Sequence, residues 1–291
     1  MIRRKLKQPI ITDSELNKIK KYNKDIESGY RPWVTVRQSH THGQGHVVHS
    51  FKTRRDHHLL SRGERLPFFM FERDSSVVDI LEQYPLPISS TMALAKKHNI
   101  LHPGAYKERK KHDNKIPAKT MTTDLVVIRK KPSGQFVLQP YSFKYAGALD
   151  VIDQDIRKYN RTKNKLRLEE KYWETQTKEL VILTEKDFNR TEIYNLEFFR
   201  ECYDYPEHTI VSEEFRHIIY LNICKHFLEY PKLTLKQHLE LLAQDLNIEF
   251  FQIFYVFQKL VYENILTLDL THRIELYRPV RLYSKVRNYA A

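Results

Sequence analysis

An aspartate and a lysine stand at opposite ends of one predicted β-hairpin. Residues 122–145 contain two apolar runs on either side of a turn at residues 131–134, with Asp124 opening the first run and Lys144 closing the second. Antiparallel strands joined by a short turn pair side by side, so this spacing brings an acid and a lysine together at one sheet edge. Carboxylates bind metal ions, and an ammonium orients water or stabilises charge on a phosphate. The pair is therefore a candidate for phosphoryl chemistry.

A third acid completes a pattern known from nucleases. In the PD-(D/E)xK architecture an acid lies on one strand, an acid-x-lysine follows on the next, and an earlier glutamate lies on a helix. Glu64, in the helical segment SRGERLPFF, takes the earlier position, and Asp124 and Lys144 take the others. Ser142 stands two residues before the lysine, where these nucleases carry an acid. Acids and lysines are common, so the spacing alone does not separate a nuclease site from chance.

The composition is that of a folded protein with room for two modest domains. The chain has 291 residues, of which 41% are hydrophobic and 12% aromatic,. No run approaches the roughly 20 apolar residues of a membrane helix, and the basic N-terminus has no apolar segment after it. We therefore expect neither a membrane partner nor a secretory signal. Cys202 and Cys224 are predicted to be reduced thiols of a cytosolic protein,.

The charge favours a polyanionic partner. Forty-nine Lys and Arg against 36 Asp and Glu give a net charge of +13. Each phosphate that a cation neutralises releases counterions and adds affinity for nucleic acid. A basic segment near Glu64 is predicted to follow the DNA backbone, through Lys52, Arg54, Arg55, Arg62 and Arg65,.

Six histidines in the same region raise the alternative of a zinc site. They are His40, His42, His46, His49, His57 and His58. No cysteine accompanies them, and their spacing is not that of a structural zinc motif. Phosphate contact, or packing beside the active site, is the favoured interpretation.

Residues 1–190 are predicted to form one α/β domain on a mixed sheet. Strands are expected at residues 31–38, 46–53, 77–86 and 178–188, besides the two of the hairpin,. Helices are expected at residues 57–74, 91–100 and 153–176. A linker is expected at about 191–200.

Residues 201–291 have the pattern of a winged-helix domain. Three helices, at residues 212–230, 234–247 and 248–266, precede two alternating β-runs at residues 265–283,. The third helix has Lys259 as its only basic residue, which is poor for reading a DNA groove. DNA contact and protein contact both stay open for this domain.

Several blocks of the sequence together resemble one family. RPWVTV, HVVHSFKTRRDHHLLSRGE, SSVVDILEQYPL, MTTDLVV, LRLEEKYWETQ and VILTEKDF follow one another across residues 31–188. In this order they resemble the TnsA endonuclease subunit of heteromeric bacterial transposases. The resemblance implies a type II restriction-endonuclease-like catalytic domain, with Glu64, Asp124 and Lys144 as catalytic residues.

The resemblance also implies Mg²⁺ as the cofactor, with Mn²⁺ as an expected substitute. Glu64, Asp124 and the backbone carbonyl of Phe143 are expected to hold most of the metal, because the neutral Ser142 supplies at most one weak oxygen. Glu169, on the helix after the hairpin, is either an accessory residue of this site or part of a solvated helix face.

The implied function is cleavage of the 5′ ends of a transposon in double-stranded DNA during cut-and-paste transposition. The expected partners are the integrase-type transposase TnsB, which cuts the 3′ ends, and the AAA+ regulator TnsC. The expected location is the bacterial cytoplasm, at the nucleoid when active. The alternatives are a restriction-type or repair endonuclease that works alone, and a DNA-binding regulator with an inactive nuclease domain. The intact triad argues against the regulator.

Overall fold

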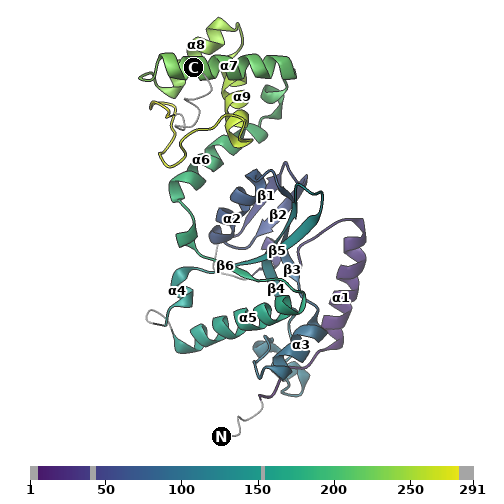
Figure 1. Cartoon of the computed structure of the whole chain (residues 1–291). Helices are drawn as coiled ribbons and strands as arrows, with labels where there is room; N and C mark the ends of the chain where they lie inside the picture. The colour runs from purple at the N-terminus through teal and green to yellow at the C-terminus, as the bar shows by residue number, and fades with distance from the viewer. Residues whose placement is uncertain (1–5, 40–43, 152–154, 282–291) are drawn as a thin grey trace. The chain divides into compact units, whose positions relative to one another are not determined.

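The computed structural model describes residues 6–39, 44–151 and 155–281. The chain divides into two compact units, Met1–Asp187 and Phe188–Ala291, and Figure 1 labels their elements. Within the described ranges, no helix has both the length and the apolar character needed to cross a membrane.

The first unit is built on a four-stranded sheet. Its strands lie in the order β3 (Val77–Pro85), β4 (Thr122–Lys130), β5 (Phe136–Phe143) and β6 (Val181–Leu183). The first three are antiparallel, whereas β6 runs parallel to β5. The predicted mixed sheet is therefore confirmed. A separate two-stranded sheet pairs β1 (His46–Ser50) with β2 (Arg55–Leu59).

The helices of this unit surround the sheet. They are α1 (Asp13–Asp25), α2 (Arg62–Arg73), α3 (Ile88–Lys97), α4 (Ala146–Leu149) and α5 (Ile156–Thr175). In Figure 1, α2 and α5 lie on opposite sides of the sheet. Ser61 caps α2, because its side-chain oxygen accepts a hydrogen bond from the Glu64 amide at 3.3 Å,. This cap fixes Glu64 in the first turn of α2.

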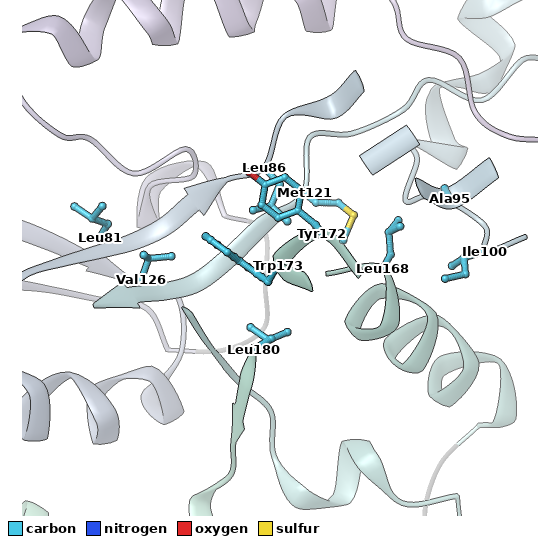
Figure 2. Close-up of a cluster of buried hydrophobic side chains, with 10 residues drawn as sticks. All are labelled: Leu81, Leu86, Ala95, Ile100, Met121, Val126, Leu168, Tyr172, Trp173 and Leu180. Atoms are coloured by element: carbon cyan, nitrogen blue, oxygen red, sulfur yellow. The ribbon is translucent and has the colours of Figure 1, made fainter. Parts of the chain in front are cut away.

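A hydrophobic cluster holds α5 against the strands (Figure 2). Leu81 and Val126 from the strands pack in one cluster with Leu168 and Trp173 from α5. The Trp173 indole N–H also donates to the Thr123 hydroxyl at 2.8 Å, and both side chains are buried. Because a buried indole needs a hydrogen-bond partner, this contact fixes the position of α5 next to the start of β4.

Two predicted elements differ from the structure. Residues 31–38 form no strand, and only Val36–Gln38 is regular, as a short 3₁₀ turn. The Trp33 ring is buried, and its amide donates to the Gln83 carbonyl, so this segment is fixed to β3 without being a strand of the sheet. The helix expected at residues 57–74 begins at Arg62, because the first residues of that range belong to β2.

The second unit contains four helices in its described part. They are α6 (Arg190–Arg200), α7 (Glu213–Glu229), α8 (Leu235–Asp245) and α9 (Phe250–Tyr262). The residues expected to be a linker therefore form α6. Its buried Asn195 side chain donates to the carbonyls of Leu270 and His272 and accepts from the Ile274 amide.

The three helices expected after residue 201 are present as α7, α8 and α9. Residues 265–281 form no β-ladder within the described part, although the Asp269 amide donates to the Arg281 carbonyl at 3.0 Å. The winged-helix assignment, with its hairpin at residues 265–283, stays a prediction.

Gly63 tests how tightly α2 is packed against the end of β5. A Cβ at this position would lie 1.9 Å from the Phe143 ring. Such overpacking costs roughly 1–3 kcal/mol, so we expect Gly63→Ala to lower the melting temperature by several degrees. Gly147→Ala is the matched control, because a Cβ there meets nothing within 4 Å. Equal melting temperatures for the two variants in calorimetry would show that α2 does not pack as described.

Candidate active site

The hairpin brings Asp124 and Lys144 into direct contact. The Lys144 Nζ donates to Asp124 Oδ2 at 2.7 Å and to the Phe143 carbonyl at 2.6 Å. The Phe143 amide donates to the same Asp124 oxygen at 2.9 Å. Both charged side chains are largely buried, at 19% exposed for Lys144 and 11% for Asp124. The expected juxtaposition of the acid and the lysine is thus present, with the Phe143 backbone between them.

A second carboxylate reaches this site from α5. The Ser142 hydroxyl donates to Glu169 Oε1 at 2.8 Å, and both residues are almost fully buried. The strand position where nucleases carry an acid is thus occupied by a serine in contact with an acid from a helix. Of the two interpretations of Glu169, the solvated helix face does not agree with its exposure of 1%.

Glu64 faces the site from the first turn of α2. Its Oε2 accepts hydrogen bonds from the Leu60 amide at 2.9 Å and the Gln83 side chain at 3.3 Å. Its Oε1 accepts from the Ser61 hydroxyl at 3.0 Å. Glu64 is 6% exposed. A carboxylate has about four lone-pair positions, so these donors fix its orientation and leave room for one further ligand.

Opposite charges set the protonation of Asp124 and Lys144. Burial alone would raise the pKa of the Asp124 carboxyl, but the charges of Lys144 and Lys165 and the donated hydrogen bonds hold it below its usual range. Burial alone would lower the pKa of the Lys144 ammonium, but Asp124, Glu169 and Glu64 raise it. Both groups are therefore charged at neutral pH.

The other two carboxyls titrate near neutrality. Burial raises the pKa of Glu64 to about 7, and the nearby Asp124 carboxylate adds to this rise. The pKa of Glu169 is also raised to about 7, by burial first and by Asp124 second. These two acids hold a proton readily unless another cation joins the site.

Lys165 is a charge near the site that the sequence patterns did not indicate. It acts electrostatically on Asp124 and Glu169, lowering the pKa of each carboxyl. It lies four residues before Glu169 on α5, and residues with this spacing share one helix face,. The four-residue spacing could have indicated from the sequence that Lys165 lies near the site, but only if Glu169 was already known to point into the protein.

The oxygen atoms of the site suit a hard divalent cation. Asp124 Oδ2 and the Phe143 carbonyl already hold one cation, the Lys144 ammonium, between them. Carboxylate and carbonyl oxygens are the ligands that Mg²⁺ prefers. Within the described residues, however, no three or more His, Cys, Asp or Glu side chains are close enough to hold a metal. The donor set thus fits a metal held partly by the backbone.

Of the five predicted DNA-binding cations, three make contacts within the protein and two are exposed to solvent. Arg55 contacts both carboxylate oxygens of the buried Glu82 at 2.9 and 3.0 Å, so its charge is used inside the protein. Lys52 donates to the Asp74 carbonyl through its Nζ, and Arg65 lies 5.4 Å from the Phe69 ring centroid. Arg54 and Arg62 are exposed to solvent. Lys52, Arg54 and Arg55 line one cavity of about 560 Å³.

Of the described histidines of this region, His49, His57 and His58 make polar contacts, and none of the described histidines belongs to a metal cluster. His57 is fully buried; its Nδ1 donates to the Glu82 carboxylate at 2.9 Å, and its Nε2 lies 2.6 Å from the Thr53 hydroxyl. His49 contacts Asp56 at 2.7 Å near the surface. His40 and His42, which also entered the zinc alternative, lie outside the described residues.

The raised pKa of Glu169 predicts a pH-dependent stability of the metal-free chain. Between its ordinary value of 4.5 and the folded value of about 7, the folded protein binds more protons than the unfolded protein,. Its contribution to the free energy of unfolding is therefore present below pH 4.5 and lost as the pH rises through 7. Glu169→Gln cannot titrate, so chemical denaturation should show a smaller fall for this variant from about pH 5 to 8.

The control for this experiment is on the same helix. Glu174 has a side chain that is 58% exposed, so Glu174→Gln should keep the wild-type slope. The same slope for Glu169→Gln and for the wild type would contradict the buried position of Glu169.

Two comparisons with known proteins show what this chain is similar to. Residues 74–185 match the family described as TnsA-like endonuclease N terminal, a range that contains Asp124, Lys144 and Glu169 but not Glu64. The chain is also 37% identical over 170 residues to the Transposon Tn7 transposition protein TnsA of Escherichia coli. That match covers 58% of this chain and 55% of the relative, so it spans about half of the relative's length. Together with the mixed sheet, these findings show that the chain contains a TnsA-type endonuclease domain.

Proposed function

We propose that this chain is a divalent-metal-dependent endonuclease subunit of a Tn7-like transposase that cleaves the 5′ ends of the transposon. The observation that supports this proposal most strongly is the contact of Lys144 with Asp124 and the Phe143 carbonyl, beside the buried Glu169. A lysine, two acids and a backbone oxygen at one site can supply the metal ligands and the cation that assist hydrolysis of a phosphodiester.

The residues of the site have different roles, which follow from their chemistry. Glu64, Asp124 and the Phe143 carbonyl would hold the metal, which would be Mg²⁺ or, in its place, Mn²⁺. When bound, this metal neutralises phosphate charge and makes water a better nucleophile. Lys144 has three N–H donors, and its described contacts use two,. The third is available to position the attacking water in line or to stabilise charge at the phosphorus.

Glu169 takes over the role of the acid that is absent at residue 142. Its carboxylate reaches the Ser142 hydroxyl, so the negative charge comes from α5 instead of β5. We assign Glu169 and Ser142 an accessory role, in which the Glu169 carboxylate, held by the Ser142 hydroxyl, stabilises the charge of Lys144. With Glu169 in place of an acid at residue 142, the site has as many acids as the nuclease pattern.

We assign the binding of DNA and of protein partners to the basic surface and to the second unit. The net charge of +13 fits the double-stranded DNA of the transposon ends, with Arg54 and Arg62 as the exposed cations near the site,. We keep Lys52 and Arg65 as further candidates for DNA contact, whereas Arg55 serves the fold through Glu82. The relative is a transposition protein of Tn7. The family resemblance implies, as partners, the integrase-type transposase TnsB and the AAA+ regulator TnsC, and we assign to the predicted winged-helix domain of residues 201–291 the holding of DNA or of a partner.

An endonuclease that works alone is the second candidate. It would use the same site, so the geometry of Asp124 and Lys144 does not separate the two functions. Cleavage of naked DNA by the purified chain, without any partner, would favour it. A regulator with an inactive nuclease domain is disfavoured, because Lys144 contacts Asp124 and the charges of Glu64 and Glu169 act on it.

The deciding experiment is Asp124→Ala in a reconstituted transposition reaction. Loss of a metal ligand that also orients the lysine removes several kcal/mol of transition-state stabilisation, so 5′ cleavage should fall at least about a hundred-fold. Joining of the 3′ ends by the partner should persist. Glu174→Ala, at a side chain of α5 that is 58% exposed, is the control and should cleave normally. Survival of 5′ cleavage in Asp124→Ala would show that the assigned site is wrong.

A further inference from the structure

Gln83 is a buried amide with an unusual backbone conformation beside the site. It is 3% exposed and lies in the interior of β3, yet its φ is +48°. Non-glycine residues adopt this left-handed region at a cost, and such residues persist where the surrounding structure holds them. Its neighbours Glu82 and Tyr84 pair with Leu125 and Thr123. Gln83 is thereby placed across from Asp124.

Backbone contacts from the N-terminal segment hold this conformation. The Trp33 amide donates to the Gln83 carbonyl at 3.2 Å, and the Tyr30 hydroxyl donates to the Glu82 carbonyl at 2.6 Å. Trp33 is itself buried, with the Tyr22 ring at its edge. The segment at residues 31–38, which forms no strand, therefore holds β3 in place at Gln83.

The side chain of Gln83 joins two elements of the site. Its Nε2 donates to Glu64 Oε2 at 3.3 Å, and its Oε1 accepts from the Thr122 hydroxyl at 3.0 Å. An amide nitrogen faces a carboxylate and an amide oxygen faces a hydroxyl, which is the orientation that satisfies both neighbours. The other donors to Glu64 are Leu60 and Ser61, from the local turn that begins α2. Gln83 thus ties the Glu64 carboxylate to β4, two residues before Asp124.

We propose that Gln83 is a positioning residue that sets the Glu64 carboxylate relative to Asp124 for binding of the divalent metal. The inference rests on the proposed function, because Glu64 and Asp124 are the metal ligands there. Residues that hydrogen-bond to a ligating carboxylate typically change metal affinity or activity by about 10–100-fold when they are replaced.

The test is Gln83→Asn in the full chain. Asparagine tolerates the left-handed conformation, but its shorter side chain does not span from Thr122 to Glu64. We expect Mn²⁺ affinity, measured by isothermal calorimetry, to fall about ten-fold or more, while the variant still unfolds cooperatively at a somewhat lower melting temperature. We also expect cleavage in the reconstituted reaction to need more metal and to recover at high metal concentration.

One control and a second variant make the result decisive. Gln139→Asn shortens a glutamine of β5 outside the site and should leave Mn²⁺ affinity unchanged. Gln83→Met keeps the length of the side chain without its hydrogen bonds, and it should weaken Mn²⁺ binding as Gln83→Asn does. Wild-type Mn²⁺ affinity in both Gln83 variants would overturn the inference. So would a loss of folding in both, because it would show that Gln83 serves the fold.

Glu64→Ala separates this inference from the proposed function. If Glu64→Ala weakens Mn²⁺ binding but the Gln83 variants do not, only the positioning role is wrong. If Glu64→Ala leaves Mn²⁺ binding unchanged, the assigned metal ligands are wrong as well.

Discussion

The buried ion pair between Lys144 and Asp124 is the interaction on which the rest of the domain depends. Moving two charges out of water costs several kcal/mol per ion, and their attraction offsets this cost only in good geometry with further hydrogen bonds. The amide and carbonyl of Phe143 supply those hydrogen bonds, one to each partner. A hydrophobic pair would be easier to bury, so the charges are better explained by chemistry than by stability.

The neighbouring helices place further charged groups around the ion pair of Lys144 and Asp124. Helix α5 is fixed by the Trp173 indole on Thr123, and it places Glu169 and Lys165 near Asp124. Helix α2 begins at the Ser61 cap, which places Glu64 in its first turn. The close packing of Gly63 against Phe143 then joins α2 to the end of β5. Each charged group is thus positioned by a contact with the strands that hold the pair.

Local patterns predicted much of this arrangement, and contacts between distant segments supplied the rest. The alternation in residues 122–145 and the spacing of Asp124 and Lys144 predict the hairpin and its charged end. Nothing in the spacing of Glu169 distinguishes a buried acid from a solvated one, because that depends on which face of α5 packs on the sheet. Arg55 illustrates the opposite case, since a basic residue in a basic segment is bound to Glu82, 27 positions away. The segment at residues 31–38 looks like a strand but supports Gln83 instead.

The central claim is that Asp124 Oδ2 and the Phe143 carbonyl, which hold the Lys144 ammonium here, also hold the divalent metal. The most direct measurement is a crystal structure of the chain grown with Mn²⁺ and recorded at a wavelength that shows manganese by anomalous scattering. The account predicts an anomalous peak in contact with Asp124, Glu64 and the Phe143 carbonyl, with the Lys144 Nζ moved away from at least one of its two oxygens. A peak elsewhere on the protein, with the contacts of Lys144 unchanged, would contradict it.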